Sequence, residues 1–119
     1  MRILVVEAGK LPVVREIDGS LESMQKIVGG LIQAVYPFDE PVALICNDEG
    51  KINGLPMNRQ IREIDDIIHG TFFLCAAPAD SEHFATLSAE QIERYTQRFR
   101  CPEIFLPLGD NLVLVFTDQ

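Results

Sequence analysis

Residues 42–59 read VALICNDEGKINGLPMNR, and together with DIIHGTFFL at residues 66–74 they decide the fold. The first five residues of this stretch are apolar, as in a buried strand. Residues 47–50, Asn-Asp-Glu-Gly, have the composition of a tight turn, in which glycine supplies a positive φ angle. Residues 51–53 are expected to return as a short antiparallel strand. The run at 70–76 is almost continuously apolar, which predicts a central strand buried on both faces.

The rest of the chain predicts two helices and further strands. Ser20 is a suitable N-cap for a helix over residues 21–28, and a glycine pair ends this helix. Ser88 and Gln91 form a capping box at the start of a second helix, which ends before Pro102. Further strands are expected at residues 3–6, 12–17, 31–36, 104–106 and 112–116.

This order of elements predicts an α+β fold. The first two strands are close enough in sequence to form a hairpin, and so are the last two. Most other connections are too short for the crossovers that parallel strands need. Residues 61–68 have helical spacing, although a single turn fits them equally well. We therefore expect one domain over residues 1–119, a largely antiparallel β-sheet with two α-helices packed on it in two layers.

Charge and composition exclude several classes of protein. The chain has 119 residues, a net charge of −8 and a pI near 4.6. Nucleic-acid-binding proteins neutralise phosphates with clustered Lys and Arg, so direct nucleic-acid binding is not expected. The longest apolar runs fall far short of the roughly 20 residues that a membrane-spanning helix needs. The N-terminus also lacks the apolar region of a secretory signal. We expect a protein partner, and the acidity serves solubility or attracts a basic surface.

Cysteine and histidine placement argues against catalysis and metal binding. Cys46, Cys75 and Cys101 are widely spaced and form no Cys-x-x-Cys pair, so a zinc or thioredoxin-like site is not expected. Unpaired thiols are typical of a reducing cytoplasm, which is the expected location. His69 follows Asp66 closely, but residues at this spacing on a strand point to different places. We therefore expect no catalytic residue, no metal site and no cofactor.

The candidate binding residues surround an apolar loop. In one interpretation, the polar residues Asn47, Asn53, Asn58 and Arg59 form a rim around the apolar tip Leu55-Pro56-Met57, and this tip inserts into a groove of a partner protein. In the other interpretation, Asn47 and Asn53 satisfy the backbone of turns, whereas Asn58 and Arg59 cap or brace the following segment. Residue types and spacing leave both interpretations open.

Several segments resemble one known family. They include Val-Arg-Glu-Ile at 14–17, Ile-Cys-Asn-Asp-Glu-Gly-Lys at 45–51, Gly-Leu-Pro-Met-Asn-Arg at 54–59 and Asp-Ile-Ile-His-Gly-Thr-Phe-Phe at 66–73. In these segments the chain is similar to bacterial and phage proteins of the family named domain of unknown function 3846, over most of residues 1–99. The loop between residues 59 and 66 is shorter than in many members. The resemblance implies that the protein is encoded as cargo by a conjugative element or phage. It implies no catalytic residue.

Three functions follow as hypotheses. The first is a non-enzymatic protein-interaction domain of a mobile genetic element. The second is an inhibitor of host defence whose acidic surface imitates DNA, which requires rows of carboxylates on one face. The third is a small-ligand-binding enzyme, which requires Asn53, Asn58, Arg59 and His69 to line one deep pocket. Edge strands such as residues 112–116 also offer a route to a homodimer.

Overall fold

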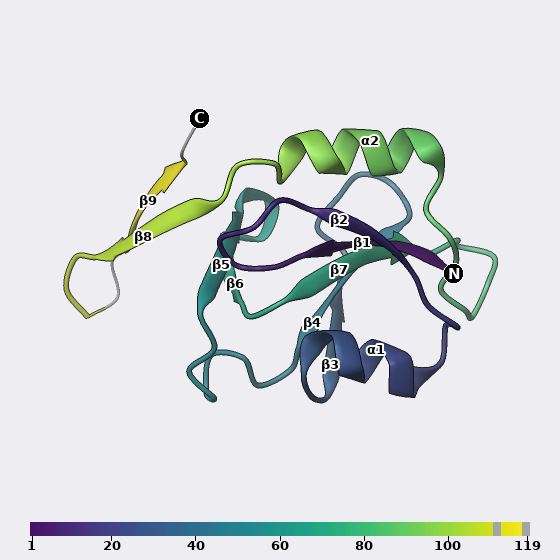
Figure 1. Ribbon diagram of the computed structural model, residues 1–119, viewed down its shortest axis with the longest axis horizontal. Helices are drawn as coiled ribbons and strands as arrows, with labels where there is room; N and C mark the ends of the chain where they lie inside the picture. The colour runs from purple at the N-terminus through teal and green to yellow at the C-terminus, as the bar shows by residue number, and fades with distance from the viewer. Residues whose placement is uncertain (111–112, 118–119) are drawn as a thin grey trace.

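A five-stranded antiparallel sheet forms the centre of the molecule in the computed structural model, which describes residues 1–110 and 113–117 (Figure 1). The strand order is β2-β1-β7-β4-β3, and every neighbouring pair is antiparallel. The apolar run that predicted a central strand lies in the middle of the sheet as β7. The strands are β1 (Arg2–Val6), β2 (Val13–Glu16), β3 (Ile32–Val35), β4 (Val42–Asn47) and β7 (Phe72–Ala76).

Both predicted helices form, with the predicted caps. In α1 (Leu21–Val28) the Ser20 hydroxyl accepts a hydrogen bond from the Ser23 N–H at 3.1 Å. Gly29 ends this helix with a φ of 79°, a left-handed conformation that glycine adopts without strain. In α2 (Ala89–Arg98) the Ser88 and Gln91 side chains bond each other's backbone N–H groups as a complete capping box. The caps fix where each helix starts, and therefore how it meets the sheet.

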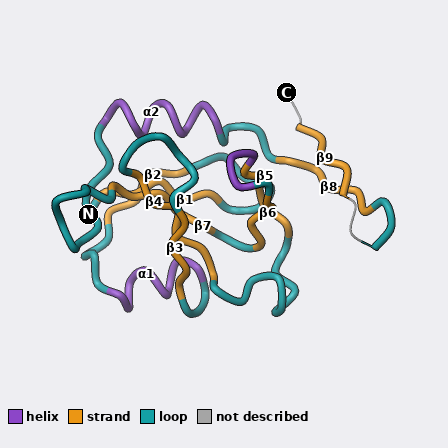
Figure 2. Tube along the Cα trace, turned by 180° about the vertical axis from the view of Figure 1, so that it is seen from behind, coloured by secondary structure: helices purple, strands orange, loops and turns teal. Residues whose placement is uncertain are grey.

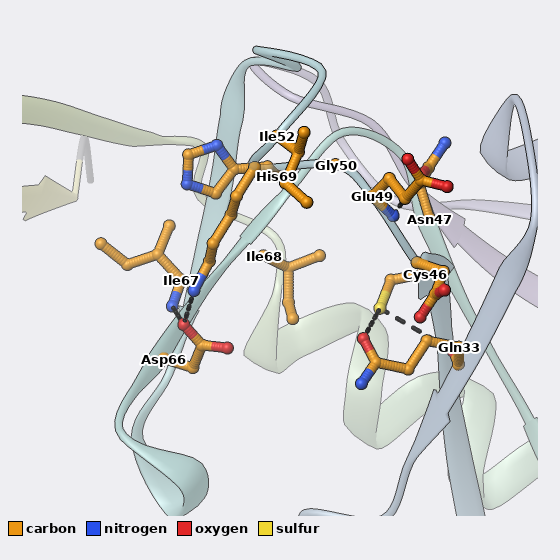
Figure 3. A pocket seen from close by; sticks show the side chains of 12 residues that line it. Gln33, Cys46, Asn47, Glu49, Gly50, Ile52, Asp66, Ile67, Ile68 and His69 are labelled. Carbon is orange, nitrogen blue, oxygen red and sulfur yellow. Dashed lines mark hydrogen bonds and ion pairs between the residues drawn. The ribbon is translucent and has the colours of Figure 1, made fainter.

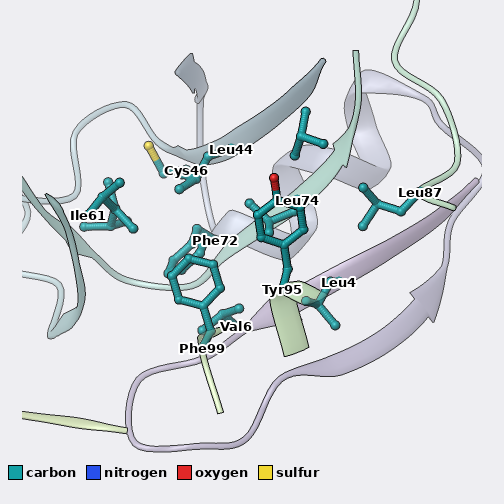
Figure 4. Close-up of a cluster of buried hydrophobic side chains, with 12 residues drawn as sticks. Leu4, Val6, Leu44, Cys46, Ile61, Phe72, Leu74, Leu87, Tyr95 and Phe99 are labelled. Carbon is teal, nitrogen blue, oxygen red and sulfur yellow. The ribbon is translucent and has the colours of Figure 1, made fainter. Parts of the chain in front are cut away.

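The two helices cover opposite faces of the sheet, so the domain has three layers, and the expected two-layer arrangement is wrong (Figure 1). The reason is that the central strands are apolar at successive positions. In β1, Ile3 and Val5 pack on the α1 side, whereas Leu4 and Val6 pack on the α2 side. Figure 4 shows the cluster on the α2 side, where Phe72 and Phe99 meet edge to face with ring centroids 5.5 Å apart.

The helix considered for residues 61–68 does not form; of the two alternatives only the single turn is present, inside a second, two-stranded sheet. This sheet consists of β5 (Met57–Ile61) and β6 (Asp66–His69), joined by one 3-10 turn at Arg62–Ile64. Asp65 closes this turn in a left-handed conformation with a φ of 49°. Ile61 and Ile68 are apolar at helical spacing, but they pack into the α2-side core from two antiparallel strands. The pair β5 and β6 is called the ribbon below.

The prediction of a short returning strand at residues 51–53 is wrong. These residues form consecutive turns, in which Asn53 N donates to Glu49 O and Leu55 N donates to Gly50 O. Gly50 lies so close to β6 that a Cβ atom there would be 2.6 Å from the His69 carbonyl oxygen. This close approach brings the turn against the ribbon and leaves no room for a strand between them.

The predicted C-terminal hairpin forms from β8 (Glu103–Pro107) and β9 (Val113–Thr117). It projects from the body of the domain beyond the ribbon (Figures 1 and 2). Glu103 ties its base to the ribbon, because the Glu103 carboxylate accepts a hydrogen bond from Gln60 N at 2.9 Å. Among the described residues, no helix combines the length and apolar character needed to cross a membrane.

Candidate functional site

Asn58 is a structural residue inside the domain. It is fully buried, and its side-chain Nδ2 donates to the carbonyl oxygens of Val6 and Gly70, each at 2.9 Å. These two bonds join β5 to the end of β1 and to the corner between β6 and β7. No side-chain atom of Asn58 is left to contact a partner.

Arg59 is also fully buried, and it holds three parts of the fold together. Its guanidinium donates to the Lys10 carbonyl at 2.8 Å, the Phe99 carbonyl at 2.9 Å and the Asn58 side-chain oxygen at 2.9 Å. Nε has no hydrogen-bond partner among the described residues, and no carboxylate there forms an ion pair with this side chain. Burial lowers the pKa of Arg59. The polar rim expected around the loop therefore does not include Asn58 or Arg59.

The remaining candidate binding residues are only partly available. Asn53 is exposed in the turn, whereas Leu55 and Met57 are half-buried. Leu55 folds back over Gly70, where an added Cβ would lie 2.7 Å from a Leu55 methyl carbon. The loop is therefore packed against the ribbon, and it is less of a free apolar tip than the sequence suggested.

A small pocket of about 250 Å³ lies between the turn after β4 and strand β6 (Figure 3). His69 lines it, but Asn53, Asn58 and Arg59 do not, so the single pocket that the enzyme hypothesis requires is not formed. Cys46 also lines the pocket. Burial, with the nearby Asp66 carboxylate, raises the pKa of the Cys46 thiol to about 11, which keeps it protonated and weakly nucleophilic.

His69 connects this pocket to the loop that contains Leu55. Its Nδ1 lies 3.0 Å from the Leu55 carbonyl oxygen. Because a carbonyl oxygen only accepts, Nδ1 carries a proton in this contact, and Nε2 is an acceptor when the ring carries no second proton. Lys51 and Asp66 form an ion pair on the same wall. Within the described residues, no group of three acidic, cysteine or histidine side chains is placed to hold a metal ion.

A larger cleft of about 720 Å³ lies between the ribbon and the C-terminal hairpin. It shares the Lys51, Asp66, Ile67 and His69 wall with the small pocket. Sequence patterns did not reveal this cleft, because β8 and β9 carry the apolar composition of core strands. One signal was available: no residue between 104 and 109 is charged, in a chain with a net charge of −8.

The hairpin leaves large apolar side chains in water. Ile104, Leu106 and Leu108 are 55%, 48% and 53% exposed. A two-stranded hairpin on its own is marginally stable in water and normally needs an apolar face to be covered. The three exposed side chains, called the hairpin patch below, therefore form a surface on which a partner can pack.

Ion pairs neutralise part of the acidic surface. Five carboxylates are each within ion-pair distance of a cationic group on the same chain, and such a carboxylate presents less negative potential than a free phosphate. These pairs belong to Glu7, Glu16, Glu40, Glu63 and Asp66.

Comparisons with known proteins give a family and nothing closer. A model of the family described as domain of unknown function (DUF3846) matches residues 1–100. No curated protein and no solved structure matches the chain. The match spans the five-stranded sheet, both helices and the ribbon, and it ends just before the hairpin. The chain belongs to the DUF3846 family, and its C-terminal β-hairpin lies outside the matched residues.

Proposed function

We propose that this protein is a non-enzymatic interaction domain that binds a basic partner protein through its C-terminal hairpin. The hairpin patch supports this proposal most directly. Ile104, Leu106 and Leu108 stand on an element that projects from the domain, and each is about half exposed. An exposed apolar cluster of this kind is typical of an interface.

Charge supports a basic partner. The chain has a net charge of −8, so a second acidic protein would be repelled before contact. A basic partner would be attracted over a distance of about one Debye length, roughly 10 Å at 0.1 M salt. It would then meet an uncharged apolar patch, where contact involves no loss of hydration from a charged group.

The family resemblance adds a setting to the proposal. It supports a role in a conjugative element or phage, acting in the cytoplasm on a protein of the element or of its host. The unpaired thiols of Cys46, Cys75 and Cys101 fit a reducing compartment.

Affinity capture from the native host tests the proposal. The full chain carries the tag, and the wild type is compared with the double variant Ile104→Ser/Leu106→Ser. We expect the wild type to retain a basic protein. The variant should retain at least about tenfold less of this protein, since burying two such side chains stabilises a complex by a few kcal/mol. Circular dichroism checks that the variant keeps its fold.

The matched control is Leu21→Ser/Leu31→Ser. These two residues are 55% and 59% exposed at the start of α1 and just after it, away from the hairpin (Figure 1), so the control removes a similar amount of exposed apolar surface elsewhere. We expect this control to retain the partner as the wild type does. Equal retention by the wild type and the hairpin variant, or retention of no protein at all, would contradict the proposed function.

A further inference from the structure

We propose that the cleft between the ribbon and the hairpin binds a short segment of the partner that combines basic and apolar side chains. This inference rests on the proposed function and names the chemistry of the partner. The cleft has a volume of about 720 Å³. That volume lies within the range of roughly 300–1,000 Å³ that is usual for binding sites in proteins.

The register of the ribbon explains one wall of the cleft. Arg59 and Ile68 form a cross-strand pair and point into the core. The neighbouring pairs, Gln60 with Ile67 and Met57 with His69, line the cleft on the outer face. This wall therefore offers two apolar side chains and two polar ones.

The hairpin forms the opposite wall. Pro107 and Val113 provide apolar surface, and Asp110 provides a carboxylate near the hairpin turn. The Glu103 hydrogen bond to the ribbon fixes the distance between the walls at their base. A segment that enters the cleft contacts apolar groups from both walls.

The charges that line the cleft indicate that the bound segment is positively charged. Three carboxylates, those of Asp65, Asp66 and Asp110, line the cleft against one ammonium group, that of Lys51. Lys51 is already paired with Asp66. Asp65 and Asp110 are exposed, come from opposite walls and form no ion pair among the described residues. Lys or Arg side chains of a bound segment would pair with them.

His69 adds a hydrogen-bond acceptor to the same wall. When the ring is neutral and its Nδ1 proton is directed at the Leu55 carbonyl, Nε2 can accept from donors such as a lysine ammonium or an arginine guanidinium. The acceptors of the cleft therefore match a segment rich in donors.

Titration of the isotope-labelled full chain with synthetic octapeptides, followed by amide chemical shifts, tests this inference. The probes are alternating Lys–Val, Glu–Val and Lys–Ser peptides. We expect the Lys–Val peptide to shift amides of residues 57–60, 65–69 and 108–110. The Lys–Ser peptide should bind more weakly because it lacks apolar side chains, and the Glu–Val peptide should not bind. Affinity for Lys–Val should fall as added salt shortens the Debye length.

The variant Asp65→Asn/Asp110→Asn removes the two unpaired carboxylates. Asparagine tolerates the left-handed backbone of residue 65 well, so the fold should be kept. We expect about a three- to tenfold loss of affinity for Lys–Val, as is usual for two exposed charge pairs. The control Asp80→Asn/Glu93→Gln makes the same change in net charge away from the cleft and should have no effect.

Several outcomes would overturn the inference. These are absence of Lys–Val binding, equal binding of the Glu–Val peptide, shifts at other residues, or equal losses in the variant and its control. A dimer seen by analytical ultracentrifugation, with its interface at the cleft amides, would show that a second copy occupies the site and would also overturn it. If the cleft variant retains the captured partner while the hairpin variant loses it, the proposed function stands and the cleft inference falls.

Discussion

Replacing Arg59 tests how the domain is held together. This side chain is fully buried, and its guanidinium donates four hydrogen bonds to oxygens of three residues. Two of the acceptors are the Lys10 carbonyl in the loop after β1 and the Phe99 carbonyl at the end of α2. Arg59→Ala therefore disconnects β5 from two other parts of the fold at once.

The expected loss can be worked from these contacts. A hydrogen bond to a charged group contributes about 1.5–3 kcal/mol, so four bonds amount to about 6–12 kcal/mol in total. Burying the guanidinium without a carboxylate partner costs several kcal/mol and offsets much of this. With the cavity that alanine leaves, we expect the free energy of unfolding to fall by about 3–5 kcal/mol. A domain typically has only about 5–15 kcal/mol in all.

Urea unfolding followed by circular dichroism measures this loss, since the chain has no tryptophan. The control Arg62→Ala removes an exposed cation nearby and should stay within about 0.5 kcal/mol of the wild type. Arg59→Met keeps the apolar stem and removes the buried charge but leaves carbonyl acceptors unpaired, so about 1–3 kcal/mol should be lost. An Arg59→Ala variant within about 1 kcal/mol of the wild type would refute the reasoning, and a stabilised Arg59→Met would show that desolvation outweighs the hydrogen bonds.

Two further predictions concern thiols and pH. Burial raises the pKa of Cys46 to about 11 and that of Cys75 to about 12. An aromatic disulfide reagent should therefore label Cys101 first in the native protein, and it should label all three thiols only in urea. Rapid labelling of Cys75 in the native protein would contradict this prediction. Hydrogen bonds from the Ser20 N–H and hydroxyl lower the pKa of Asp18 from 3.8 to about 2. A lowered carboxyl pKa stabilises the fold above the unfolded value, so this contribution should be lost as pH falls from about 4 to about 2. Carbon NMR of the carboxyl group measures the pKa, and Asp18→Asn should flatten the acid side of the stability curve; an ordinary pKa would refute the assignment.

Local rules were sufficient for most of the fold. Ser20, Ser88 and Gln91 act where the sequence placed them, because capping depends on residues within one turn of each other. The helical spacing of apolar residues at 61–68 wrongly suggested a helix, because Ile61 and Ile68 reach the same core from two strands. The third layer was also missed, although β1 and β7 are apolar on both faces, a pattern that requires cover on each side.

The candidate site was harder to predict, because exposure depends on contacts far apart in sequence. Asn58 and Arg59 stood out as polar residues that core packing did not require. Their partners are backbone carbonyls up to 52 residues away, which no local pattern reveals. Asn53 does remain exposed, as a turn residue should.

The hairpin differs from the sequence prediction in the opposite sense, because residues with the composition of a core strand are exposed. Alternating apolar residues in a strand indicate that one face will be covered, but they do not say whether the same chain provides the cover. In β1 the cover is an internal helix, whereas Ile104 and Leu106 of β8 remain in water. The charge-free stretch at residues 104–109 distinguishes the two cases only when it is combined with the position of the hairpin outside the family domain. A buried polar residue that braces the fold thus resembles a binding residue in sequence, and an exposed apolar strand resembles a core strand.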